Sequence, residues 1–257
     1  GLIPCFERLK ETMNRDGWER PVWLTECGMH TANDRQNSAG FLSDLLPAAL
    51  RRIGKEPRKT AVGVLRDAES GYNVLTDDDA DYLLRPHFRR VAFISLQQLQ
   101  GLSVKDVPVL VAATDEYFPG SRFPALLDYV RRGGTIVLAG GMPFYYDAHT
   151  PDGIFLNRKE LGTSLYRQLH MAPATRWEDP ASREPLTEVP PLCERNTDIA
   201  FSYGWTPTKD SPARYLSDAN LHPGDSLIPL ISAGTAHLRY PIAGIYKLNS
   251  ELKGNII

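Results

Sequence analysis

The chain has 257 residues, of which 42% are hydrophobic and 23% are charged, and its formal net charge at pH 7 is -2. This composition is that of a globular protein with a sizeable core, and it excludes a disordered chain. The nearly neutral charge argues against a nucleic acid or an anionic membrane surface as partner, and no apolar run is long enough to span a bilayer.

Both ends of the sequence predict that the chain is an internal segment of a longer protein. The start, "GLIPCFERLKE", is already apolar with a helical pattern, and the end, "KGNII", lies within an expected strand. The start also lacks the basic and apolar regions of a signal peptide. We therefore expect a periplasmic or extracellular location only if the complete protein carries such a signal.

The first fifty or so residues predict the order helix, strand, helix. Apolar residues at helical spacing predict a helix over 5–15, and the apolar run at 22–24 predicts a buried strand that ends on Glu26. A second apolar face predicts a helix over 37–53, kinked at Pro47.

The next part of the chain predicts strands that alternate with helices. Apolar runs predict strands at 60–67, 90–96, 107–113 and 135–141. Helices are expected at 77–88, with Thr76 as N-cap, and at 121–134, with Gly133 and Gly134 as its stop. Such alternation implies parallel βαβ units, and hence a doubly wound, flavodoxin-like α/β sheet.

The pattern weakens beyond residue 142 and becomes clear again near the end. A helix is expected at 160–171, and the Pro-rich stretch that follows predicts little regular structure. Apolar runs at 226–234, 240–248 and 254–257 predict a β meander that completes the far edge of the sheet.

Glu26 is the first candidate for chemistry, because a carboxylate at the carboxyl end of a buried strand lies where α/β folds collect their reactive groups. Such a carboxylate can act as nucleophile or acid in glycoside hydrolysis. It can equally form an ion pair with Arg20 or Arg35, or cap the following turn. Spacing alone favours the ion pair or the cap over a catalytic role.

The stretch "RPVWLTECG" resembles the seventh barrel strand of the clan A glycoside hydrolases, whose "W-(L/I)-T-E-x-G" strand end carries the nucleophilic glutamate. The resemblance covers roughly the first fifty residues. It implies that Glu26 is the nucleophile, with Trp23 and His30 as candidate substrate-binding residues. It also implies a carbohydrate substrate for the full-length protein.

The sequence departs from that family at the second catalytic carboxylate. Those enzymes take their acid/base from an Asn-Glu pair, and no such dipeptide occurs in the chain. A retaining mechanism needs two carboxylates roughly 5 Å apart, and a complete barrel needs roughly 250 residues. We therefore expect residues 1–57 to be the terminal βα portion of a barrel whose acid/base lies outside this chain.

Residues 58–257 resemble the class I glutamine-amidotransferase-like or ThuA-like domain that follows the barrel in some glycoside hydrolases. The matching stretches are "DVPVLVAATDEYF", "LLDYVRRGGTIVLAGG" and "PIAGIYKLNSELKGNII". Family 42 β-galactosidases use a similar domain for trimer contacts, so the resemblance implies a homo-oligomer. It implies a fold, and a fold alone does not imply an activity.

An active amidotransferase needs a cysteine on a tight elbow after a strand, with a histidine and an acid to activate it. The turn at 140–143 contains neither Cys nor Ser. Cys27 follows a strand, but Thr25 replaces the glycine that such an elbow needs, and His30 is three residues away. We interpret Cys27 as a packed thiol and keep a cysteine-dependent hydrolase as a third hypothesis.

No cofactor or metal site is predicted. Gly140 and Gly141 lack the G-x-G-x-x-G spacing of dinucleotide binding, and the three cysteines form no CxxC motif. The six histidines, including His149 and His170, show no spacing typical of a metal site. Asp115-Glu116 follows a strand and could line a cleft. The aromatic stretch at 143–147 could stack on sugars, but packing is the simpler interpretation.

The leading hypothesis is thus a glycoside hydrolase segment with a non-catalytic amidotransferase-like domain. The second is a stand-alone binding or assembly module in which the first fifty or so residues add to the flavodoxin-like sheet.

Overall fold

The computed structural model describes residues 41–66, 76–112, 117–139, 144–149, 157–161, 163–174, 192–195, 215–234 and 239–257. All of them belong to one compact unit that spans Asn33–Ile257. The candidate residues Trp23, Glu26, Cys27 and His30 lie outside the described residues, so the barrel fragment expected over 1–57 is not shown.

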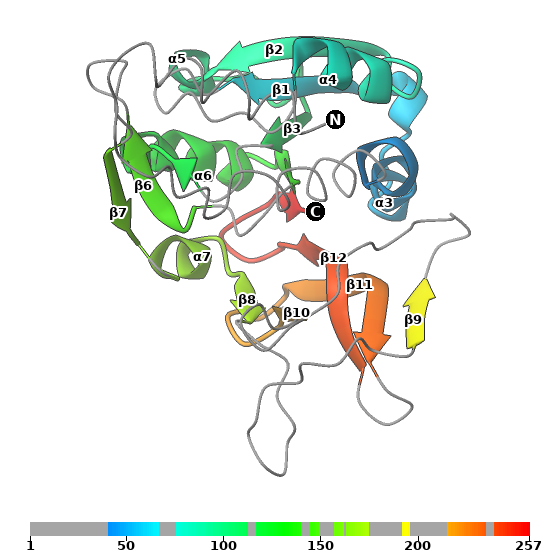
Figure 1. Ribbon diagram of the computed structural model, residues 1–257, viewed down its shortest axis with the longest axis vertical. Helices are drawn as coiled ribbons and strands as arrows, with labels where there is room; N and C mark the ends of the chain where they lie inside the picture. Colours follow the sequence, from blue (N-terminus) through cyan, green and yellow to red (C-terminus); the bar gives the residue numbers. More distant parts are fainter. Residues whose placement is uncertain are drawn as a thin grey trace, which may run out of the picture. The chain divides into compact units, whose positions relative to one another are not determined.

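The main sheet has eight strands in the order β2-β1-β3-β5-β13-β12-β11-β9, which runs from the top to the lower right of Figure 1. Their bounds are β1 Ala61–Arg66, β2 Arg90–Ser95, β3 Val109–Ala112, β5 Thr135–Leu138, β9 Leu192–Arg195, β11 Ser226–Gly234, β12 Arg239–Lys247 and β13 Asn255–Ile256. Strands β2, β1, β3, β5 and β13 pair in parallel, whereas β12, β11 and β9 extend the sheet by antiparallel pairing.

This order confirms the expected α/β sheet. The parallel strands alone follow the chain order 2-1-3-4-5, which is the flavodoxin-like order. Strands β11, β12 and β13 form the expected meander, and β13 joins it to the parallel part by pairing with β5.

The described helices are short, and along the chain most of them come between two parallel strands. Their bounds are η1 Phe41–Leu45, α3 Leu46–Arg52, η2 Pro57–Lys59, α4 Asp77–Leu84, α5 Leu96–Leu99, η3 Gly120–Arg122, α6 Phe123–Arg131 and α7 Ser164–Gln168. None of them has the length and apolarity that a membrane crossing requires.

Local signals explain where two of the expected helices begin and end. Thr76 forms a capping box with Asp79 at the start of α4, as expected. This helix ends at Leu84 instead of residue 88, because Pro86 has no amide hydrogen to continue the ladder. At the end of α6, Gly133 adopts the left-handed conformation (φ 94°) that glycine reaches without steric penalty.

Two hydrophobic clusters show that both faces of the sheet are covered. Side chains alternate along β3: Val109 and Val111 pack with α3 and α4, whereas Leu110 and Ala112 pack with α5 and α6. A kinked helix was expected in the segment 41–52, and this segment packs in the same cluster as Val109 and Val111. It therefore belongs to the α/β core.

Two smaller sheets complete the described fold. One contains β4 (Tyr117–Phe118), β6 (Tyr146–His149) and β7 (Asn157–Glu160), and the other pairs β8 (Ala172–Ala174) with β10 (Tyr215–Ser217). The sheet of β8 and β10 matters for the site described below, because β8 follows α7 in the chain and β10 precedes β11.

Candidate functional site

A cluster of polar side chains lies at the amino edge of the parallel strands. It comprises His170, His222, Asp225, Ser250 and Glu251. The first follows α7, the next two precede β11, and the last two precede β13. Because β11 and β13 are both antiparallel to β12, they begin at the same edge, opposite the carboxyl edge where such folds usually bind ligands.

Asp225 is the centre of this cluster, and its side chain has no exposed surface. Its Oδ1 accepts hydrogen bonds from the backbone amides of Asn249 (2.7 Å) and Ser250 (3.0 Å). Its Oδ2 accepts from the His222 amide (3.2 Å) and the Ser250 hydroxyl (3.1 Å). His170 Nδ1 lies 2.7 Å from the same oxygen. One carboxylate therefore joins three segments of the chain.

These bonds fix the charge of Asp225 and the tautomer of His170. Burial alone would raise the pKa of Asp225, but hydrogen bonds from the Asn249 amide, His170, Ser250 and the His222 amide hold this pKa below its ordinary value. An ionised carboxylate only accepts hydrogen bonds, so Nδ1 of His170 carries the hydrogen. The other ring nitrogen of His170, Nε2, faces Glu251.

Glu251 lies against both histidines, with 57% of its side chain exposed. Its Oε1 is 3.0 Å from His170 Nε2 and 3.0 Å from His222 Nδ1. A hydrogen bond from its own amide is the main cause that lowers the pKa of Glu251 to about 2, helped by His222, Ser250 and the nearby His170. Glu251 is therefore ionised as well.

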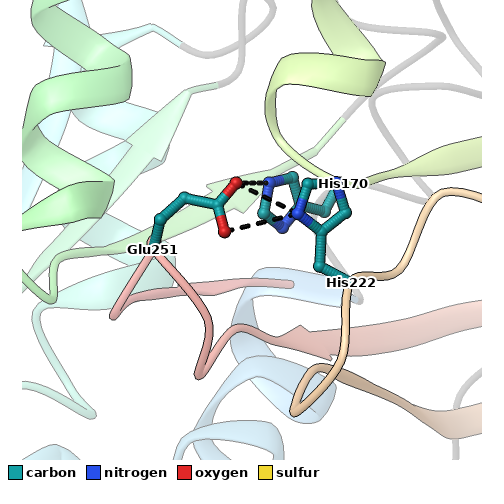
Figure 2. A group of neighbouring side chains, drawn as sticks. All are labelled: His170, His222 and Glu251. Carbon is teal, nitrogen blue, oxygen red and sulfur yellow. Dashed lines mark hydrogen bonds and ion pairs between the residues drawn. The ribbon is translucent and has the colours of Figure 1, made fainter.

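The two imidazole rings stack on each other, with centroids 3.7 Å apart and planes inclined by 21°. Figure 2 shows the Glu251 carboxylate directed at the ring nitrogens of both. The side chain of His170 is 4% exposed, whereas that of His222 is 47% exposed. One ring is thus held inside the protein and the other lies at its surface.

His170 sits in a backbone conformation that few side chains adopt. Its φ is 54°, and it follows α7 at the position that glycine usually occupies. The Met171 amide donates to the Tyr166 carbonyl (2.9 Å) and the His170 amide to the Arg167 carbonyl (3.1 Å), which is the Schellman pattern. A non-glycine residue held here points to a functional constraint on its side chain.

The cluster contains a serine, a histidine and an aspartate, but not in the arrangement of a hydrolytic triad. In a triad the hydroxyl and the carboxylate contact opposite nitrogens of the imidazole. Here the Ser250 hydroxyl lies 3.4 Å from Nδ1 of His170, the nitrogen that already binds Asp225, and it donates to that carboxylate. The histidine therefore does not activate Ser250 as a nucleophile.

The candidate residues Asp115, Glu116, Gly140 and Gly141 lie outside the described residues, and their roles stay predictions. His149 is the last residue of β6.

The aromatic stretch before β6 contributes to the core, as the packing interpretation expects. Phe144 is fully buried, and its ring meets those of Phe118 and Phe123 edge-on at 5.1 and 5.6 Å. Tyr146 stacks on Tyr117 at 5.5 Å, and both are half-buried.

Sequence reasoning missed this cluster because its members are distant in the chain. His170, His222 and Glu251 share no local motif, and each follows or precedes a different element. His170 falls inside the helix expected at 160–171, so its place after the end of α7, where glycine is usual, was not visible in the sequence. One available signal was "HPGD" at 222–225, a turn sequence that ends in an acid before an expected strand.

No protein-family model matches the chain, and no curated protein sequence matches it. Among solved structures, one titled "mmIFT52 N-terminal domain" is similar at 15% identity and a TM-score of 0.38, over 75% of this chain and 83% of that chain. A putative ThuA-like protein from Bacteroides uniformis is similar at 10% identity and a TM-score of 0.35, over 78% and 81%. These are distant neighbours. The description of the fold rests on the strand order, and that of the site on its side-chain contacts.

Proposed function

We propose that the chain is a segment of a carbohydrate-active enzyme in which Glu26 is the nucleophile of a glycoside hydrolase unit. In this proposal the α/β domain binds or assembles and does not break the glycosidic bond. The observation that carries the proposal is the sequence "RPVWLTECG", whose apolar run is predicted to be a strand that ends on a carboxylate. The acid/base partner comes from outside the chain.

The described cluster supports a binding role for the α/β domain. Asp225 accepts hydrogen bonds from the segment after α7, the segment before β11 and the segment before β13, and Ser250 is bound to it as a donor. Such an arrangement organises loops and presents His222 and Glu251 to solvent. It suits the recognition of a ligand or a second subunit better than nucleophilic attack.

The test is hydrolysis of a panel of nitrophenyl glycosides by the protein from the complete open reading frame and by its Glu26→Gln variant. Loss of the nucleophile should lower kcat/KM by several orders of magnitude. Glu19→Gln, a nearby carboxylate outside the motif, is the matched control and should keep the parental activity. Full activity in Glu26→Gln would contradict the proposal.

A stand-alone assembly module is the second candidate, and the observation that favours it is the compact unit Asn33–Ile257 with its own two-sided core. It predicts no glycosidase activity and a defined oligomer of this chain in light scattering. The hypothesis of a cysteine-dependent hydrolase can be distinguished from both candidates, because Cys27→Ala would abolish the activity of a cysteine-dependent hydrolase alone.

A further inference from the structure

The side chains of His170, His222 and Glu251 have the chemistry and placement of a metal-ligand set. We propose that they bind one divalent transition-metal ion of the zinc class, with Asp225 positioning His170. One ligand atom from each residue lies within 4.8 Å of the others, and Figure 2 shows them converging from three segments. Two histidines and a glutamate form a known zinc ligand combination. The inference goes beyond the proposed sugar chemistry and does not depend on it.

A proton or a metal ion between His170 Nε2 and the Glu251 oxygen accounts for their 3.0 Å contact. Because Nδ1 of His170 donates to Asp225, the neutral ring carries a lone pair on Nε2. That lone pair faces an ionised carboxylate oxygen of Glu251 at 3.0 Å. Two acceptors at this distance repel each other unless a proton or a metal ion binds both. A proton joins only this pair, whereas one metal ion also binds His222.

The surroundings of His170 are those of a metal-bound histidine. In metal sites the nitrogen that does not bind the ion usually donates to a carboxylate or carbonyl, which fixes the tautomer and the ring orientation. Asp225 makes this contact here at 2.7 Å, and both side chains are almost completely buried. The left-handed backbone of His170 holds the ring against Asp225 and Glu251.

Metal binding requires one ring to turn. The lone pairs of two nearly parallel rings, inclined by 21° at 3.7 Å, do not meet at one point within coordination distance. His170 is fixed by Asp225, so the ring that turns is His222, whose side chain is 47% exposed. The fixed ligand and Glu251 thus form the initial site, and His222 closes on the ion.

The experiment is calorimetric titration of the tag-free full chain with Zn²⁺ near neutral pH, together with the visible absorption of bound Co²⁺. The test variant is His222→Ala/Glu251→Gln, which leaves the buried His170–Asp225 pair intact. We expect it to lose one binding event, or to weaken that event by more than roughly 100-fold, because two of three ligands are gone. The Co²⁺ band should disappear in the same variant.

The matched control is His87→Ala/Glu56→Gln, which removes one histidine and one glutamate outside the cluster. Its Zn²⁺ affinity and stoichiometry should equal those of the parent. In histidine ¹⁵N spectra, Zn²⁺ should shift Nε2 of His170 and leave its Nδ1 protonated. The proposal is overturned if the parent binds no Zn²⁺, or if the test variant binds it with the parental affinity and stoichiometry.

Discussion

His170 Nδ1 donates a 2.7 Å hydrogen bond to Asp225, between side chains that are 4% and 0% exposed. The bond joins the end of α7 to the loop before β11, and the same carboxylate accepts from the loop before β13. A buried charge with this many donors is a point on which the local fold depends.

Replacing Asp225 by asparagine should therefore destabilise the domain strongly. The new NH₂ group faces donors that the carboxylate accepted, so at least one of them becomes unmatched. We expect a loss of about 2–4 kcal/mol in the free energy of unfolding, measured by urea denaturation. Asp218→Asn, an exposed position in the same loop, should change it by less than about 0.5 kcal/mol. Equal effects of the two variants would show that Asp225 does not hold the loops together.

The left-handed backbone of residue 170 predicts an unusual order of variant stabilities. His170→Gly and His170→Ala both lose the bond to Asp225, but only glycine adopts a φ of 54° without steric penalty. The glycine variant should be more stable than the alanine variant by about 1 kcal/mol, opposite to the order in a helix interior. An alanine variant at least as stable as the glycine variant would contradict this conformation.

Buried tyrosines predict loss of stability at alkaline pH. Burial, helped by the nearby charge of Asp218, raises the pKa of Tyr246 to about 12. Its hydroxyl donates to the Ser217 carbonyl at 2.9 Å. The unfolded tyrosine ionises near its ordinary pKa of about 10. Its stabilising contribution is therefore complete below that pH and falls as pH rises toward 12, by roughly 2–3 kcal/mol in all.

Tyr246→Phe tests this sign. The variant should be less stable than the parent at pH 8, because a hydrogen bond is lost, and its stability should decline less steeply between about pH 10 and 12. Parallel stability curves for the two proteins would mean that Tyr246 is not protected from ionisation.

Gly63 lies where a strand and its neighbours leave no room for a side chain. A Cβ at this position would be 2.8 Å from Cγ1 of Ile94 and 2.8 Å from Cγ1 of Val107. Gly63→Ala should destabilise the domain by about 1–3 kcal/mol in thermal or urea unfolding. In an Ile94→Ala background the cost should be smaller, and strictly additive effects would rule out the proposed contact.

The sequence predicts those parts of the fold that local signals determine. The helical spacing of Phe123, Leu126 and Val130 predicts the buried face of α6, and Gly133 predicts its end. Thr76 predicts the start of α4 through its side-chain cap. Each of these features depends on contacts within about one or two helical turns, which a sequence pattern contains.

The candidate site depends on pairing over long distances and so is not visible in the sequence. The loops with Asp225 and Glu251 meet because β12 runs between β11 and β13, which places both strand starts at one edge. His170 reaches them from α7 through Asp225. A spacing rule for metal ligands cannot detect three residues that different elements supply.

The measurement that tests the metal site most directly is a crystal structure of the zinc-soaked protein with anomalous data at the zinc edge. We predict a peak at roughly 2.0–2.2 Å from His170 Nε2, His222 Nδ1 and a Glu251 oxygen, with His222 turned out of its stack. A crystal that shows the two rings still stacked, with no anomalous peak between them and Glu251, would contradict the account.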